Sequence, residues 1–212
     1  MQRAIYRAQC QAGRVAEATA HLQKTVPALQ RRIAGGELMT ISVFRWVRDL
    51  FLYCESIQAE IPPGQLFGPM EAWLEPWPGA EAARSWVPMI EVFHFDRPAS
   101  VEHWRRPQPP EKRLGKVGRL WPEKVASYVY YHFQLQEEQG LPGSKYQFIG
   151  LHENLLFLYD EQPPVVEPLV HAKGLATTGT PANWADTRMD LHFIPWPDGI
   201  RYNREIDPVF SL

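Results

Sequence analysis

The chain lacks several features that would assign it to a large functional class. It has no basic stripe, since 22 Lys and Arg stand against 24 Asp and Glu, with both signs interspersed and a formal net charge of −2. Nucleic-acid binding requires basic residues gathered on one surface, so a nucleic-acid partner is not expected. No apolar run approaches the roughly 20 residues that span a bilayer, so no membrane partner is expected either.

Cysteine is scarce as well. Cys10 and Cys54 are the only two, which is too few for a metal cluster. Each falls on an expected strand, where a free cysteine behaves as a small apolar residue. Residues 1–6 lack the apolar stretch of a signal peptide, so we expect a reduced, cytoplasmic protein.

Signatures of cofactor binding and nucleophilic catalysis are also missing. The glycine-containing turns at 140–143 and 178–180 lack the strand-to-helix context of a phosphate-binding loop. The sequence shows no serine nucleophile elbow and no Cys–His arrangement. Its histidines have no compact metal-binding spacing, so we expect neither a cofactor nor a metal ion.

What the chain does have is an internal repeat. The run Leu-Phe-Leu-Tyr-x-Glu occurs at residues 50–55 and returns at residues 156–161. Each copy follows an apolar stretch and a polar turn, which predicts the second arm of a β-hairpin. A short strand and a helical stretch precede each hairpin, so the order of elements repeats too. This predicts an ancient duplication, with chance similarity between two apolar strands as the alternative.

The repeated order predicts an α+β protein made of two ferredoxin-like βαββαβ repeats. The expected elements of the first repeat are a strand at 5–11, a helix at 15–33 kinked or divided at Pro27, a hairpin at 38–55, a helix after residue 64 and a strand at 86–96. Those of the second are a strand at 116–121, a helix from 122 to 139, a hairpin at 145–159, a short helix at 165–173, a strand at 189–194 and an extended tail at 202–212. The expected domains are repeat 1 at 1–97, a proline-rich bridge at 98–115, and repeat 2 at 116–212, which diverges after about residue 175.

Three short motifs of the first repeat resemble a known family. Met-Ile-Glu-Val-Phe-His-Phe-Asp at 89–96 resembles the closing strand of L-rhamnose mutarotase-type proteins, which ends in Glu-Val-Phe-aromatic-Leu. Val-Pro-Ala-Leu at 26–29 resembles the Trp-Pro-Glu-Leu of that family's first helix, and the run at 50–55 resembles its apolar strand ending in Glu. The resemblance implies an intramolecular dimeric α/β barrel, in which the sheets of the two repeats face each other.

The resemblance also implies a catalytic pair. The first helix of the family carries Tyr-x-x-x-His, whose histidine is implicated in proton transfer on the sugar. Tyr128 and His132 have this spacing in the second repeat, whereas Ala18 and Leu22 stand at the corresponding positions in the first. Residues at i and i+4 share one face of a helix, so we expect His132 to carry the proton and Tyr128 to orient a sugar hydroxyl. Packing of the helix on its sheet is the alternative.

Four further polar residues are expected at the substrate site. His94 and His192 lie between apolar neighbours in expected strands, so each should point away from its flanking phenylalanines; solvent exposure is the alternative. Glu55 and Glu161 end the two copies of the repeated strand and are candidate acid/base partners, although most such carboxylates are simply solvated.

Tryptophan supplies the remaining expected contacts. Trp46 and Trp196 offer flat faces for stacking on a sugar, although packing is the commoner use of the residue. The resemblance, together with the Tyr-x-x-x-His pair, implies the binding of a small molecule, a monosaccharide, with cofactor-free mutarotation by proton transfer through histidine. Two alternatives stay open: a non-catalytic ligand-binding or interaction protein of the dimeric α/β barrel superfamily, and a haem- or aromatic-compound-binding, oxygenase-like member. Homodimerisation also stays open.

Overall fold

The computed structural model describes residues 1–170 and 174–212. The chain divides into two compact units, Met1–Met89 together with Ile206–Leu212, and Ile90–Glu205. Both units combine helices with antiparallel sheet, which confirms the mixed class of fold that the sequence predicts. Among the described residues, none of the helices combines the length and the apolarity that crossing a bilayer requires.

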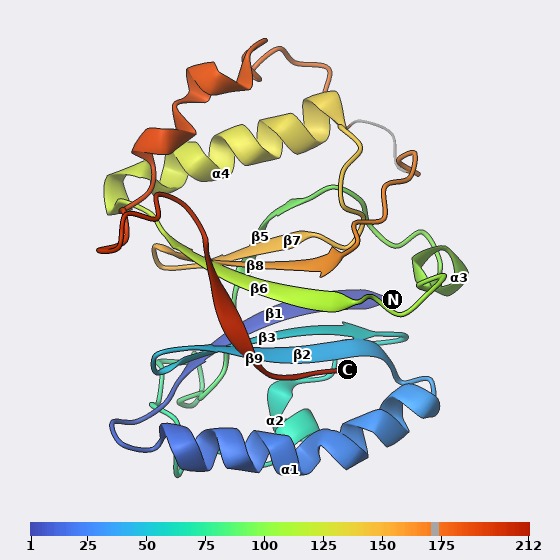
Figure 1. Ribbon diagram of the computed structural model, residues 1–212, viewed down its shortest axis with the longest axis vertical. Helices are drawn as coiled ribbons and strands as arrows, with labels where there is room; N and C mark the ends of the chain where they lie inside the picture. Colours follow the sequence, from blue (N-terminus) through green and yellow to red (C-terminus); the bar gives the residue numbers. More distant parts are fainter. Residues whose placement is uncertain (171–173) are drawn as a thin grey trace. The chain divides into compact units, whose positions relative to one another are not determined.

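The first unit follows the order β-α-β-β-α-β along the chain. Its elements are β1 (Gln2–Gln9), α1 (Val15–Ala34), β2 (Leu38–Trp46), β3 (Asp49–Ser56), α2 (Pro63–Phe67) and β4 (Val87–Pro88), joined by β9 (Arg204–Ser211) near the C-terminus. The strands lie in the order β4-β1-β3-β2-β9, with antiparallel pairing throughout. α1 covers one face of this sheet and continues through Pro27 as one helix (Figure 1).

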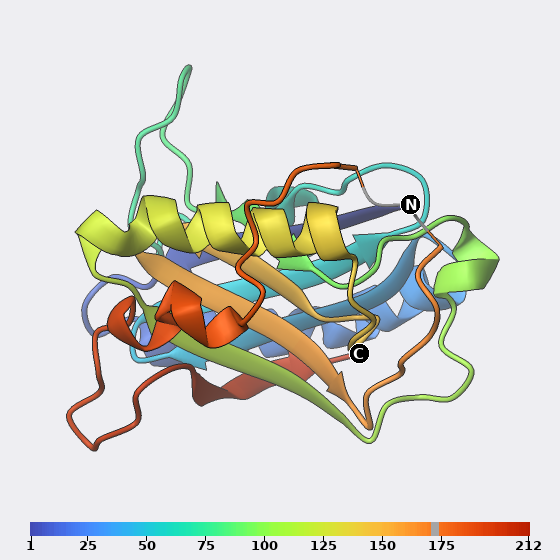
Figure 2. The ribbon, with the colours of Figure 1, turned by 90° about the horizontal axis from the view of Figure 1, so that it is seen from above.

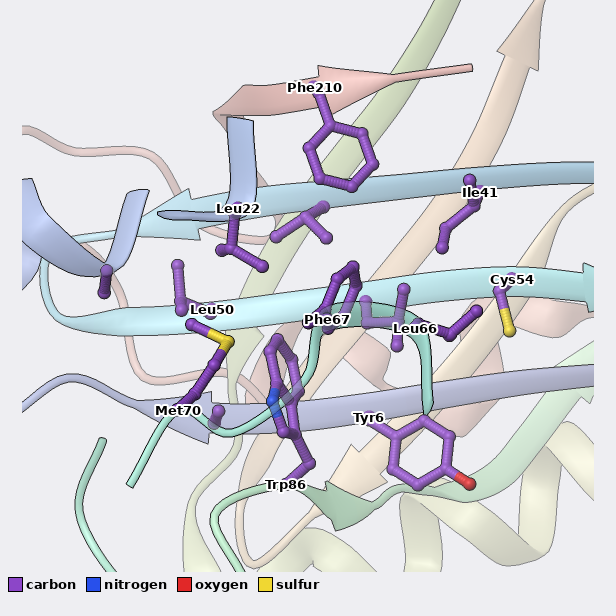
Figure 3. Close-up of a cluster of buried hydrophobic side chains, with 14 of the residues drawn as sticks. Tyr6, Leu22, Ile41, Leu50, Cys54, Leu66, Phe67, Met70, Trp86 and Phe210 are labelled. Atoms are coloured by element: carbon purple, nitrogen blue, oxygen red, sulfur yellow. The ribbon is translucent and has the colours of Figure 1, made fainter. Parts of the chain in front are cut away.

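The core of the first unit lies between α1 and the sheet. The helical period places Ala18 and Leu22 on the buried face of α1, and strand alternation turns Leu50 and Leu52 of β3 toward them. Figure 3 shows this cluster, with Phe210 of β9 packed at its edge. The apolar periodicity read from the sequence therefore identifies this core correctly.

Both cysteines belong to the same core. Cys10 and Cys54 are buried free thiols, as the sequence predicts. Burial raises the pKa of Cys10 to about 11 and the pKa of Cys54 to about 12. Both thiols therefore stay protonated at neutral pH and act as small apolar side chains.

The second unit has its own antiparallel sheet. Its strands are β5 (Ile90–His94), β6 (Lys112–Arg119), β7 (Phe148–His152) and β8 (Leu155–Gln162), in the order β6-β8-β7-β5. Its helical elements are α3 (Val101–Trp104), the 3₁₀ turn η1 (Pro122–Lys124), α4 (Val125–Gln134), the π-helical turn η2 (Leu135–Gln139), and the 3₁₀ turns η3 (Trp184–Thr187) and η4 (Met189–Leu191). α4 runs across one face of the sheet, and residues 184–191 lie beside it (Figures 1 and 2).

Two of the expected strands are wrong in detail. The expected strand at 86–96 is two strands that separate at Met89, because its two parts pair with different strands: β4 pairs with β1, whereas β5 pairs with β7. The expected strand at 189–194 is the turn η4 followed by a single bridge between Phe193 and Leu120. Arg188 just before it adopts a left-handed conformation, with φ of 51°, which turns the chain out of an extended path.

Other segments also differ from expectation. Residues 165–170 form no helix, because Pro168 cannot donate a helical hydrogen bond, and residues 171–173 of that expected helix lie outside the described part of the chain. The expected bridge at 98–115 contains α3 and the beginning of β6. The tail is extended as expected, and its residues Arg204–Ser211 form strand β9, which pairs with β2.

Within each unit, the corresponding strands pair in the same register. Arg3 of β1 lies opposite Glu55 of β3, and Arg113 of β6 lies opposite Glu161 of β8. The hairpins β2–β3 and β7–β8 also match residue by residue, so the repeated run occupies corresponding positions in both sheets.

The hairpin turns are held by corresponding hydrogen bonds. The Cys10 amide donates to the Arg48 carbonyl at 2.7 Å, and the Leu120 amide donates to the Asn154 carbonyl at 2.9 Å. In return, the Arg48 guanidinium donates to the Cys10 carbonyl at 2.8 Å, and the Asn154 side-chain amide donates to the Leu120 carbonyl at 2.7 Å. Two different side chains thus make the same connection.

The correspondence extends to the segment that follows α2 in the first unit. The Gln11 amide donates to the Trp73 carbonyl at 2.8 Å, and the Trp121 amide donates to the His192 carbonyl at 2.9 Å. Trp73 and His192 therefore hold corresponding positions beside the residues that follow β1 and β6.

The helices correspond in the same way. β1 and β6 begin at Gln2 and Lys112, and α1 and α4 begin at Val15 and Val125, so both pairs are separated by the same number of residues. Counting from these starts places Tyr128 at the position of Ala18, and His132 at the position of Leu22.

Candidate functional site

Tyr128 and His132 lie one turn apart on the face of α4 that packs on the sheet. Their rings stack with centroids 4.0 Å apart and an interplanar angle of 29°. Tyr128 is 2% exposed, and burial raises its phenol pKa, so the hydroxyl stays protonated. His132 is half-buried and meets Phe93 of β5 and Trp184 of η3 edge-on, each with ring centroids 5.6 Å away. Three elements thus enclose the imidazole.

The hydrogen bonding of His132 defines its tautomer. Its Nδ1 lies 2.9 Å from the Tyr128 carbonyl, and a carbonyl only accepts, so Nδ1 carries the proton and Nε2 carries the lone pair. Burial lowers the pKa of His132 to about 4, because leaving water disfavours the imidazolium; the Tyr128 bond opposes this shift, and His192 adds to it. At neutral pH the ring is therefore uncharged, and Nε2 has a lone pair that can accept a hydrogen bond or a proton.

His192 is the third member of this group. It lies at the end of η4, is 4% exposed, and turns toward α4 rather than away from Phe193 along a strand. Its Nδ1 lies 3.0 Å from the Arg188 carbonyl, and its Nε2 lies 2.8 Å from Ser127 Oγ. Its ring centroid is 6.3 Å from that of Tyr128. The structure therefore brings together three residues predicted from the sequence: Tyr128, His132 and His192.

The first unit shows what its fold requires at these positions. Ala18 and Leu22 are fully buried in the core, and Trp73 packs against that core. No hydroxyl or imidazole occupies these three positions in the first unit. The polar side chains of the second unit therefore exceed what packing needs.

Glu161 lies on the other face of its sheet. Leu156 and Leu158 join the cluster that contains Tyr128, and strand alternation turns Glu161 to the opposite side. Glu161, a candidate acid/base partner, therefore lies on the face of the sheet opposite Tyr128.

The Glu161 carboxylate is instead held in a buried polar network. Tyr159 donates its hydroxyl to it at 2.6 Å, and Arg106 donates through Nη2 at 2.7 Å and through Nε at 3.1 Å. Arg113 Nε lies 3.8 Å away. Charge-assisted bonds of this kind offset the cost of removing the carboxylate from water.

Glu55 has corresponding surroundings in the first unit. It is fully buried, and Tyr53 donates its hydroxyl to it at 2.5 Å. The repeated run thus places a tyrosine and a glutamate in the same contact twice.

His94 ends β5 and bonds to nearby polar groups. Its ring contacts the carboxylate of Glu91, and its backbone amide donates to Oε1 of Gln136 at 3.0 Å. The bond to Gln136 ties the end of β5 to η2, the turn that follows α4.

The two predicted stacking tryptophans have different surroundings. Trp196 is 5% exposed, donates its indole N–H to the Tyr202 carbonyl at 2.7 Å, and has the guanidinium carbons of Arg119 and Arg204 at 4.5 and 4.8 Å from its ring centroid. Trp46 ends β2 in the first unit and is half-buried. Trp184 is the tryptophan that meets His132.

Ser127 is the residue that the sequence did not indicate. It bonds to a residue 65 positions away, and no local spacing connects two residues so far apart. Only the correspondence between Trp73 and His192 would have indicated that His192 lies near α4.

Within the part of the chain that the structure describes, no three His, Cys, Asp or Glu residues are grouped so as to hold a metal ion. Comparison of the chain with protein-family models, curated proteins and solved structures gave no match. The resemblance to L-rhamnose mutarotase-type proteins therefore stays a prediction.

Proposed function

We propose that the chain is a tandem duplication of a ferredoxin-like repeat, and that its second repeat carries a proton-transfer site for a small polar ligand. The single observation that carries this proposal is the presence of His132 where the other repeat has a buried leucine, Leu22. Burial removes this imidazole from water and lowers its pKa to about 4, so the position disfavours the charged ring. Buried titratable side chains that have a shifted pKa and that packing does not require are typical of functional sites. The closure of the two sheets into an intramolecular dimeric α/β barrel stays a prediction.

The proposed ligand is a monosaccharide, and the proposed reaction is mutarotation. This reaction removes the proton of the anomeric hydroxyl and protonates the ring oxygen; the open aldehyde then rotates and recloses. Nε2 of neutral His132 accepts the hydroxyl proton, and the resulting imidazolium returns a proton to the ring oxygen. The carbonyl of Tyr128 holds the tautomer and the Tyr128 ring fixes the imidazole plane. Trp184 offers an apolar flank for sugar C–H groups.

Saturation-transfer NMR on the anomeric protons of L-rhamnose, L-fucose, galactose and glucose tests this proposal. We expect the protein to accelerate the exchange between α and β anomers of one of these sugars. His132→Leu, which installs the residue of the other repeat, should abolish the acceleration. His21→Leu on α1 is the matched control and should leave it unchanged. Unaltered exchange with His132→Leu would exclude His132 as the proton carrier.

Tyr128→Phe separates the two roles of the tyrosine. It keeps the ring that stacks on His132 and removes the hydroxyl that was expected to orient the sugar. Because the hydroxyl is almost fully buried, we expect the exchange rate to fall less than threefold. A loss as large as that of His132→Leu would assign the hydroxyl a direct role.

A non-catalytic ligand-binding protein is the second candidate. The absence of the Tyr–His pair from the first repeat favours it, because a symmetrical catalytic duplication would keep both pairs. Thermal stabilisation by one sugar without accelerated anomer exchange would support this alternative. A Soret band in the purified protein would instead identify the haem-binding alternative.

A further inference from the structure

Ser127 and His192 form a hydrogen-bonded pair with the geometry of a nucleophile and its base. Ser127 Oγ lies 2.8 Å from His192 Nε2, and the other ring nitrogen, Nδ1, lies 3.0 Å from the Arg188 carbonyl. A nucleophile within hydrogen-bond reach of a base, with the base oriented by a third group, is the arrangement that activates serine. Here the third group is a backbone carbonyl.

The direction of the hydrogen bonds supports this role. The Arg188 carbonyl can only accept, so Nδ1 of His192 carries the proton of the neutral ring. Nε2 is then an acceptor, and the Ser127 hydroxyl donates to it. The Lys124 carbonyl, 3.1 Å from Ser127 Oγ, is a second acceptor for the hydroxyl when Nε2 is protonated. Both protonation states of His192 are therefore accommodated.

The first unit shows that the fold does not require the hydrogen bond between Ser127 and His192. Ser127 corresponds to Glu17, which is exposed and pairs with Arg14, and His192 corresponds to Trp73. The backbone bonds of the Trp73 and His192 carbonyls are nevertheless the same in both units. The segment of the first unit that contains Trp73 thus docks without a serine–histidine bond, and the pair is an addition in the second unit.

The two side chains differ in their access to solvent. His192 is 4% exposed, whereas Ser127 is half-buried and lies in the first turn of α4. A buried base beneath a more accessible hydroxyl leaves the nucleophile as the group that an incoming molecule meets first.

We propose that Ser127 is a nucleophile activated by His192, with esters as its substrate class. Ser127 Oγ bonds to the ester carbonyl carbon, its proton passes to His192 Nε2, and the bond between that carbon and the leaving oxygen breaks as the proton is delivered to this oxygen. Water then attacks the acyl-serine, and His192 takes the water's proton and returns it to Ser127 as the acid departs. This activity is separate from sugar mutarotation and does not depend on it.

A fluorophosphonate probe tests the nucleophile directly, because the bond between Ser127 Oγ and phosphorus forms as fluoride leaves and the proton passes to His192. Peptide mass spectrometry of the labelled full-length protein should place the adduct on Ser127. Ser127→Ala should abolish labelling, and Ser144→Ala, which removes a serine bonded to Asp160, should not. Hydrolysis of 4-nitrophenyl acetate should follow the same pattern.

Two substitutions test the base. His192→Trp installs the residue of the first unit, and His192→Gln keeps a polar side chain of smaller volume. Each should slow labelling of Ser127 by about 100-fold or more, the lower range for general base catalysis. Circular dichroism identifies the variants that fold, and one folded variant suffices. Labelling of no residue, labelling only at residues other than Ser127, or labelling of Ser127 at an unchanged rate in a folded His192 variant would each overturn the proposal.

Discussion

His132 occupies in the second unit the position that Leu22 occupies in the first. Both lie on the buried face of the first long helix of their unit, at the same distance from its beginning. One side chain is a fully buried hydrocarbon and the other is a half-buried imidazole whose pKa burial lowers to about 4. The chain therefore contains its own comparison between a hydrocarbon side chain and an imidazole at the same position of the helix.

Exchanging the two residues should have unequal effects on stability. Leu22→His removes a fully buried hydrocarbon and buries a polar ring, so we expect it to lower the free energy of unfolding by about 2–4 kcal/mol. His132→Leu removes a polar group from a poorly hydrated site and should change the free energy of unfolding by less than about 1 kcal/mol. Urea unfolding of both variants measures the difference. Equal destabilisation would mean that the second unit needs the imidazole for packing.

His132 also makes folding stability depend on pH. In the unfolded chain a histidine takes up its proton near pH 6.5. In the folded protein burial lowers the pKa to about 4, so the unfolded state binds the proton first as the pH falls. The stability is therefore complete above about pH 6.5 and is lost progressively down to about pH 4, by up to about 3 kcal/mol.

His132→Leu removes this contribution and serves as the reference protein. Urea midpoints measured at pH 7 and pH 4.5 should show that the wild-type protein loses more stability than His132→Leu does. The difference arises only from the residue that was exchanged, because the other titrating groups are common to both proteins. The same loss in both would show that the pKa of His132 in the folded state is close to its ordinary value.

Local patterns predicted most of the framework. The repeated run at 50–55 and 156–161, the helical period of residues 15–33 and the polar turns between apolar stretches are all short-range signals, and they placed β3, β8 and α1 correctly. The segments that failed depend on longer-range or backbone-specific effects. Residues 189–194 alternate like a strand, but the left-handed backbone of Arg188 turns the chain before them.

The candidate site was only partly predictable for the same reason. Tyr128 and His132 share a helix, so their spacing alone brought them together. Ser127 and His192 meet through the docking of η4 beside α4, which no local spacing encodes. Glu161 was expected at the same site, but strand alternation places it on the face of the sheet opposite the residues beneath α4, and the sequence does not show which face the helix covers.

The Arg106–Glu161 pair should contribute strongly to the stability of the second unit. Glu161 is 2% exposed, and Arg106 supplies its bidentate guanidinium contact. Arg106→Leu leaves the buried carboxylate with weaker partners, so we expect a loss of about 3–5 kcal/mol in the free energy of unfolding. Arg105→Leu, at the exposed neighbouring position, should change it by less than about 0.5 kcal/mol.

Replacing both Arg106 and Glu161 by leucine distinguishes two quantities. One is the free-energy cost of a buried carboxylate that has lost its cation, and the other is the net contribution of the ion pair to stability. Replacing both partners removes the buried charges together, so most of the lost stability should return. Urea unfolding of the two single variants and the double variant completes the cycle. If the loss in the free energy of unfolding of the double variant equalled the sum of the losses of the two single variants, the two residues would stabilise the unit independently.

The two hairpin turns carry backbone strain at corresponding positions. Val47 and Glu153, the first turn residues, have φ of 53° and 57°, in the left-handed region that favours glycine. The conformation costs a side chain about 1–2 kcal/mol, and more for a β-branched residue, whereas glycine loses about 0.5–1 kcal/mol of extra backbone entropy on folding. Val47→Gly should therefore stabilise the protein by about 0.5–1 kcal/mol, and Glu153→Gly should stabilise it less.

Val166→Gly is the matched control, since Val166 is similarly exposed but is not among the residues with positive φ, and it should give no gain. Thermal unfolding that ranked Val47→Gly at or below this control would show that the turn of the first hairpin tolerates valine without strain.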